Sequence, residues 1–232
     1  MTDHVRDLAS LREADERLLH AAASLDNASL AAPSRLPGWS RGHVLAHLAR
    51  NADALVNVLE GRPMYADGAT RDADIERDAS RALDVHLADV RNAAARFHHS
   101  AAVPADWTRT VTLRNGVTDT AARVPFRRWI EVELHHVDLG LDRTLEDLSE
   151  EFTEREIGFL ADRFSGAAAV PPLTLATPGG RTWRTGRAPV GGDETVAVVT
   201  GPAPDLMGWL SGRRDGSALE FASGPLPVLP PL

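Results

Sequence analysis

Residues 129–138 carry two glutamates, two histidines and an aspartate at spacings that suit metal binding. If this stretch is helical, Glu131 and His135 stand one turn apart on the same face, close enough to share one metal ion. His47 lies in a second amphipathic stretch and could supply a third ligand from another helix. Two imidazoles and one carboxylate leave a coordination position open on zinc, which is the pattern of catalytic zinc sites.

Asp138 follows His135 by about one helical turn and could orient the histidine ring through its free nitrogen. Each of these side chains also has an ordinary interpretation. A Glu/His pair at this spacing is common on helix surfaces, a single histidine such as His47 can be a hydrogen-bonded core residue, and Asp138 can be an exposed carboxylate. His43 lies one turn from His47 and could replace it. The residues alone therefore do not choose between a metal site and these alternatives.

The remaining chemistry-bearing residues give weaker patterns. The pair His98-His99 and His136 have no convincing spacing to a third ligand, and we expect them to be exposed. The chain has no glycine-rich phosphate loop, serine nucleophile elbow or nucleotide fingerprint.

Composition narrows the class of protein. With 25 lysines and arginines against 33 aspartates and glutamates, the formal net charge of -8 argues against nucleic-acid binding and against docking on anionic membranes. The chain has no cysteine, which excludes disulfides and thiolate zinc ligands, so any thiol in its chemistry must come from outside. We expect a cytoplasmic protein because no signal core or membrane-spanning segment is evident. The composition does not predict the oligomeric state.

Hydrophobic periodicity predicts five helices in the first 165 residues. The first is capped by Thr2 or Asp3, and the second runs from its cap Ser40 to about residue 60, where Gly61 stops it. The others cover about 72–98, a segment opened by Pro125, and about 149–164. Between the third and fourth, residues 110–117 resemble a hairpin with an Asn-Gly turn.

The composition changes near residue 166, where a Gly/Ala/Pro-rich segment begins. Short β-like runs and one short helix follow, at 173–176, 181–185, 195–200, 203–210 (the helix) and 218–222. The sequence therefore predicts an α+β protein with a helical bundle over residues 1–165 and a small α+β domain over residues 166–232.

The segments 36–52, 63–65, 131–140 and 206–213 resemble, in this order, the mycothiol-dependent maleylpyruvate isomerase family within the DinB-like metal-binding bundles. The resemblance implies a bundle of four main helices followed by a small α/β domain. It implies zinc ligands at His47, Glu131 and His135. It also implies an active-site arginine in the C-terminal domain, which Arg213 matches best. The neighbouring Arg214 is the alternative, and a surface arginine pair is the ordinary interpretation.

The same resemblance implies mycothiol as the external thiol and maleylpyruvate as the small-molecule substrate. A zinc-activated thiolate would add to the cis double bond, the new single bond would rotate, and loss of the thiol would give fumarylpyruvate. Arg213 would pair with a substrate carboxylate or with the developing enolate. Two other classes remain open: a mycothiol S-transferase that conjugates electrophiles on the same zinc scaffold, and a non-catalytic bundle protein.

Overall fold

The computed structural model describes residues 3–103, 105–165, 167, 170–186 and 196–231. The chain forms two compact units, Met1–Arg143 and Thr144–Leu232. The sequence predicted the division at 165/166, about one helix later. The structure divides earlier because α7 (Glu150–Phe164) packs against a helix and a strand of the second unit. Its apolar stripe therefore contributes to the core of the C-terminal unit.

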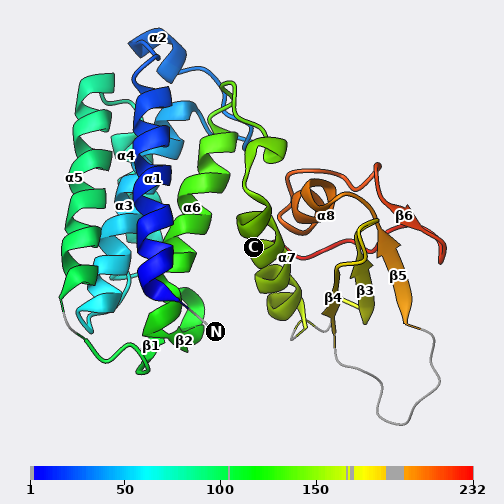
Figure 1. Cartoon of the computed structure of the whole chain (residues 1–232). Coiled ribbons are helices and arrows are strands. Elements are labelled where there is room, and N and C mark those ends of the chain that lie inside the picture. Colours follow the sequence, from blue (N-terminus) through cyan, green and yellow to red (C-terminus); the bar gives the residue numbers. More distant parts are fainter. Residues whose placement is uncertain (1–2, 104, 166, 168–169, 187–195, 232) are drawn as a thin grey trace. The chain divides into compact units, whose positions relative to one another are not determined.

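Four helices form the bundle of the first unit (Figure 1). They are α1 (His4–Ala22), α3 (Arg41–Leu59), α5 (Leu83–Ala102) and α6 (Val124–Asp138). Each packs against two others, in the cycle α1–α5–α3–α6–α1. Their inward faces bury leucine, alanine, valine and aromatic side chains, including Leu11, Leu18, Val44, Leu48, Leu55, Val90, Phe97, Trp129 and Val137. This apolar burial stabilises the bundle without disulfides.

Local capping explains where α3 and α6 begin. The Ser40 hydroxyl accepts a hydrogen bond from the amide of His43, and the His43 ring interacts with the Ser40 amide, so the start of α3 is a capping box. Gly61 follows α3 with φ of 77°. Pro125 lies in the first turn of α6, where its missing N–H costs nothing. These starts agree with the sequence prediction.

The predicted helix at 72–98 is two helices, α4 (Gly68–Asp78) and α5. Residues 79–82 separate them without a glycine or a proline, which is why the sequence showed no break. The break allows both helices to pack on α3. At this break the backbone of α3 lies close to the backbone of Ala79: a Cβ on Gly42 would lie 2.1 Å from the carbonyl oxygen of Ala79.

The predicted hairpin is present as β1 (Thr110–Thr112) and β2 (Thr118–Thr120), which pair antiparallel. The connecting turn contains a short 3-10 segment, Arg114–Gly116. Asn115 has φ of 58° and Gly116 has φ of 73°, the left-handed conformation that an Asn-Gly pair adopts readily. Short helical segments also precede α3 and α6, namely α2 (Asn27–Leu30) and η2 (Ala121–Arg123).

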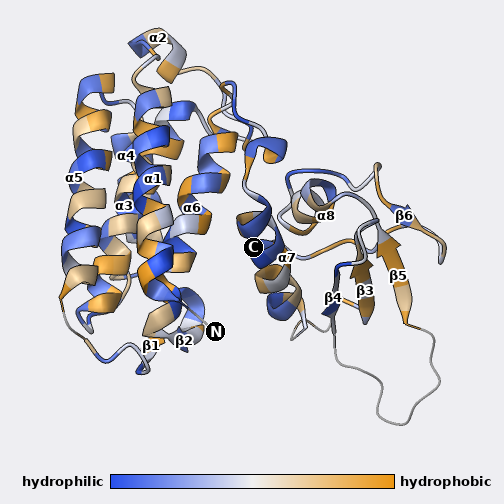
Figure 2. Ribbon diagram, viewed as in Figure 1, coloured by the Kyte–Doolittle hydropathy of each residue, from blue (hydrophilic) through white to orange (hydrophobic). Residues whose placement is uncertain are grey.

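The C-terminal unit is a small sheet with two helices. Its strands are β3 (Leu173–Ala176), β4 (Thr182–Thr185), β5 (Ala197–Thr200) and β6 (Glu220–Phe221), and they run in the order β4-β3-β5-β6. Strand β3 is parallel to β5, and the other neighbours are antiparallel. Orange, hydrophobic residues dominate β3 and β5, the two central strands (Figure 2). Besides α7, the unit contains η3 (Leu145–Asp147) and α8 (Ala203–Leu210).

The predicted bounds of β3 and α8 agree with the structure, and residue 195 of the predicted third run lies outside the described residues. Within the described ranges, the protein has no helix with the length and apolar character needed to span a bilayer.

Candidate metal centre

His47, Glu131 and His135 meet between α3 and α6. The Nε2 atoms of His47 and His135 lie 2.8 Å and 3.2 Å from the same oxygen of Glu131, Oε2. The two imidazole rings meet edge to face, with centroids 4.6 Å apart and planes at 78°. One donor atom from each residue lies within 4.8 Å of the others. The structure therefore brings together the three side chains that the sequence selected.

The electrostatics of the cluster are set by burial and by the shared carboxylate. Burial first, and then the charge of His135, lowers the pKa of His47 to about 4. Burial opposes ionisation of Glu131, but hydrogen bonds with His135 and His47 outweigh it and hold the pKa of Glu131 well below its ordinary value. Glu131 is thus an ionised carboxylate, and its side chain is 31% exposed, so the cluster opens toward solvent.

Asp138 contacts the far side of the His135 ring. Its Oδ2 lies 2.8 Å from Nδ1 of His135, and its side chain is only 1% exposed. Burial lowers the pKa of His135, but the bonds to Asp138 and Glu131 more than compensate and raise it. A carboxylate at Nδ1 fixes the proton there and directs Nε2 toward Glu131. The exposed-carboxylate interpretation of Asp138 is wrong.

The donor set fits a divalent metal of the zinc type. Two imidazole nitrogens and one carboxylate oxygen already converge on a common point, and these are ligands that zinc accepts. The low pKa of His47 keeps its imidazole neutral at physiological pH, as metal binding requires. Three protein ligands would leave a coordination position of a bound zinc ion open for an incoming molecule.

Three further side chains border the cluster. Nη2 of Arg71 lies 3.2 Å from Nδ1 of His47, and the same guanidinium bonds to Asp72 at 2.6 Å. The Trp39 ring lies 5.5 Å from the His47 ring. Burial, and then the charge of Glu131, raises the pKa of Tyr65, so its hydroxyl stays neutral and can donate. The sequence analysis did not predict Arg71 or Trp39 as site residues, because neither side chain is a usual metal ligand.

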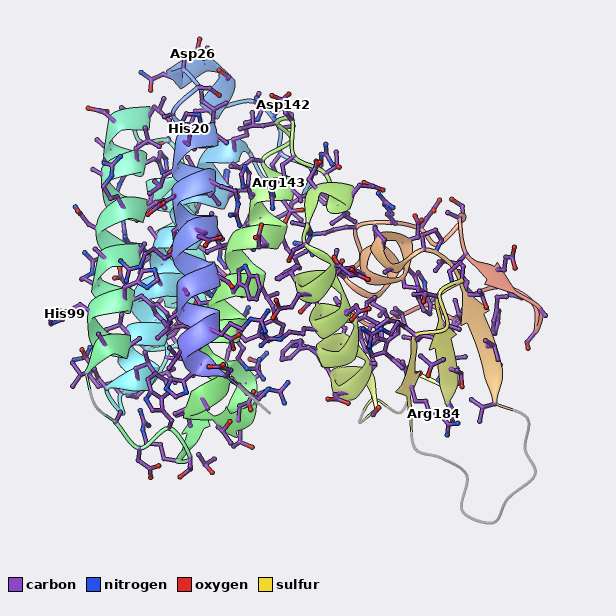
Figure 3. The ribbon with its side chains drawn as sticks, viewed as in Figure 1. His20, Asp26, His99, Asp142, Arg143 and Arg184 are labelled. Carbon is purple, nitrogen blue, oxygen red and sulfur yellow. The ribbon has the colours of Figure 1, made fainter. Side chains whose placement is uncertain are left out.

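The alternative ligand His43 and the second glutamate of α6, Glu133, lie elsewhere. The His43 ring is held by Ser40 and by Glu76, whose Oε2 lies 3.1 Å from its Nε2, so His43 does not replace His47. Glu133 faces another way and accepts bonds from Arg17 and Arg143, each at 2.9 Å or less; Figure 3 labels Arg143.

The remaining histidines differ in exposure. His99 is exposed as predicted and points away from the bundle (Figure 3). His98 is partly buried and pairs with Asp15 at 3.0 Å. The prediction that His136 is exposed is wrong, because its side chain is 5% exposed.

Arg213 and Arg214 lie just beyond α8 in the C-terminal unit. Arg214 donates to Asp205 at 2.6 Å and also bonds to Glu146, both in its own unit. Nη1 of Arg213 donates to the carbonyl of Ser211 at 3.2 Å. Arg214 therefore has a structural function in holding α8 to η3.

A helical bundle with a His/Glu/His cluster between two of its helices, followed in the chain by a small α+β unit, defines a class of DinB-like bundle proteins. Residues 11–140 match the mycothiol maleylpyruvate isomerase N-terminal domain, and residues 147–231 match the MDMPI C-terminal domain. The chain therefore belongs to the mycothiol-dependent maleylpyruvate isomerase family.

Solved structures agree with this family. A crystal structure of the mycothiol-dependent maleylpyruvate isomerase is similar with a TM-score of 0.86 and 25% identity, over 99% of this chain and 97% of that chain. A histidine-to-alanine mutant structure under the same enzyme name has a TM-score of 0.86 and 24% identity, with the same coverage. No curated protein matches the chain.

Proposed function

We propose that this protein is a zinc- and mycothiol-dependent cis-trans isomerase that converts maleylpyruvate to fumarylpyruvate. The observation that carries the proposal is the convergence of His47, Glu131 and His135. It occurs in a chain that resembles a mycothiol-dependent maleylpyruvate isomerase over 99% of its length. The family and the fold support an isomerase, and the cluster supplies the residues for its chemistry.

His47, Glu131 and His135 would hold the metal, and Asp138 would keep His135 in the required tautomer. A zinc ion held by these residues would lower the pKa of an incoming thiol and so supply thiolate near neutral pH for reversible addition to the conjugated double bond. The neutral Tyr65 hydroxyl and the Arg71 guanidinium lie beside Glu131 and His47, where they can donate hydrogen bonds to a bound anion.

Arg213 is the proposed catalytic residue of the C-terminal unit. A guanidinium can bind a substrate carboxylate, or the enolate oxygen that develops on thiol addition, through two parallel hydrogen bonds. We choose Arg213 over Arg214 because Arg213 best matches the active-site arginine that the family resemblance implies.

Proton NMR of the product tests the proposal. Zinc-loaded protein is incubated with maleylpyruvate and a substoichiometric amount of mycothiol. Isomerisation gives fumarylpyruvate with the thiol recovered, because addition and elimination leave no net change in the thiol. A stable thioether product would instead identify an S-transferase, and unchanged maleylpyruvate in the presence of both zinc and thiol would contradict catalysis.

A further inference from the structure

Arg128 is the largest of the fully buried side chains, with 1% of its surface exposed. It lies on α6 and points into the bundle. A buried guanidinium is costly unless its N–H groups are bonded and its charge is paired. Its Nη1 donates to Oδ1 of Asn51 at 2.9 Å. Nε and Nη2 have no hydrogen-bond partner among the residues that the structure describes.

The position of Arg128 relates it to the metal centre. Arg128 precedes Glu131 by three residues on α6, and Asn51 follows His47 by four residues on α3, so each pair shares a helix face. The contacts His47–Glu131 and Asn51–Arg128 are therefore successive bridges between α3 and α6, one helical turn apart. The Asn51–Arg128 contact therefore lies one layer of the bundle away from the cluster.

The nearby carboxylates are already engaged. Asp15 and Glu131 are the acidic groups whose charges act most strongly on Arg128, and they oppose the lowering of its pKa by burial. Asp15 is paired with His98, and Glu131 is shared by His47 and His135. Neither forms an ion pair with Arg128 within 4.0 Å in the described part of the chain. The charge of Arg128 is thus not neutralised by direct contact.

The unpartnered atoms of Arg128 have a specific geometry. Nε and Nη2 form one edge of the guanidinium, and this edge binds a carboxylate through two parallel hydrogen bonds. Arg41 shows the contrast: its Nε, Nη1 and Nη2 donate to the backbone carbonyls of Leu139, Ser29 and Gly140. An arginine that holds the fold together uses its donors in this way, whereas both donors of the Nε–Nη2 edge of Arg128 are buried without a hydrogen-bond partner among the described residues.

Tyr65 interacts electrostatically with both groups. The tyrosine is half-buried, and its charge interactions include both Arg128 and Glu131. The Arg71 guanidinium, which lies beside His47, is 6.0 Å from the centre of the Tyr65 ring.

We infer that the Nε–Nη2 edge of Arg128 is a carboxylate subsite that binds one end of the dianionic substrate beside the metal cluster. The identity of that substrate rests on the proposed function. The subsite explains why a costly buried charge is retained one turn from the cluster: the carboxylate supplies both the missing acceptors and the missing negative charge.

Binding of maleate, a cis-dicarboxylate, to the zinc-loaded full chain in the absence of any thiol tests the subsite by calorimetry. Arg128→Met removes the charge at similar volume and should weaken maleate binding about 10- to 100-fold, the loss expected for charge-assisted hydrogen bonds. Arg128→Lys should recover part of the affinity, because an ammonium lacks the bidentate fork. Arg109→Met is the matched control, since Arg109 donates to the carbonyls of Val58 and Leu59 at the end of α3; it should leave maleate affinity unchanged.

Thermal stability distinguishes the subsite from a structural function. Without maleate, Arg128→Met should melt at the wild-type temperature or above it, because an unpaired buried charge is removed. Maleate should raise the melting temperature of the wild type more than that of the variant. A lower melting temperature with unchanged maleate affinity in Arg128→Met overturns the inference. If that variant does not fold, wild-type affinity in Arg128→Lys overturns it.

Maleate binding is measured without turnover, so the subsite and the proposed function can be contradicted separately. Maleate binding that depends on Arg128 in a protein that does not isomerise maleylpyruvate would support the subsite and contradict the proposed function. Isomerisation with an unchanged KM in Arg128→Met would support the proposed function and contradict the subsite.

Discussion

Asp138→Asn should weaken zinc binding without removing a metal ligand. The carboxylate is 1% exposed, and its Oδ2 lies 2.8 Å from Nδ1 of His135. Asparagine keeps the size of the side chain and can still present an oxygen to Nδ1, but the hydrogen bond loses its charge. Such bonds to ionised groups are roughly twice as strong as neutral ones. Loss of a carboxylate behind a metal-bound histidine typically costs about 10- to 100-fold in affinity, or about 1.4–2.7 kcal/mol.

Competition with a chromophoric chelator at constant pH measures this change as a zinc Kd. The matched control is Asp142→Asn, which alters an exposed carboxylate four residues further along (Figure 3). We expect a wild-type Kd for Asp142→Asn and a Kd raised about 10- to 100-fold for Asp138→Asn. Equal Kd values for both variants and the wild type would refute the reasoning that Asp138 orients His135.

Three further predictions concern the fold and the C-terminal unit. Gly42→Ala puts a methyl group 2.1 Å from the carbonyl oxygen of Ala79 and should lower the free energy of unfolding by about 1–3 kcal/mol. Gly68 has open space where a Cβ would lie, so Gly68→Ala should not lower it. Chemical denaturation measures the free energy of unfolding of both variants. Burial lowers the pKa of His86 below its ordinary 6.5, so the unfolded chain binds more protons below pH 6.5 and the stability decreases as the pH is lowered. In melting curves of the metal-free protein, His86→Phe should weaken this decrease. An unaltered dependence of the melting temperature on pH would contradict the prediction. Arg213→Ala should retain zinc yet lose most isomerisation, and full turnover in this variant would remove Arg213 from the mechanism. Arg214→Ala should lower the melting temperature because it breaks bonds to Asp205 and Glu146.

Local signals in the sequence predicted much of the fold. The cap at Ser40, the proline at 125 and the bounds of β3 and α8 follow from short-range rules, and the structure agrees with them. The separation of α4 from α5 contains no glycine or proline and depends on how both helices pack on α3. The unit boundary depends likewise on the partners of α7, and periodicity along one helix does not reveal its partners.

The candidate site was likewise predicted only in part from the sequence. Spacing along α6 pairs Glu131 with His135. The apolar stripe of α3 favours His47 over His43, which is one turn away and nearer the start of the helix. The capping box at Ser40 engages His43, and the bundle brings His47 to Glu131. Arg128 was missed because a buried, partly unpaired arginine departs from the rule that buried positions are apolar.

The metal content of the purified protein tests the central claim most directly. Elemental analysis after zinc loading and gel filtration should give about one zinc per chain in the wild type, because one cluster of three ligands is present in the described residues. His47→Ala and His135→Ala should each lose most of that zinc, and Glu131→Gln should lose part of it, since each removes one of three donors. Equal zinc content in the wild type and all three variants would contradict the account.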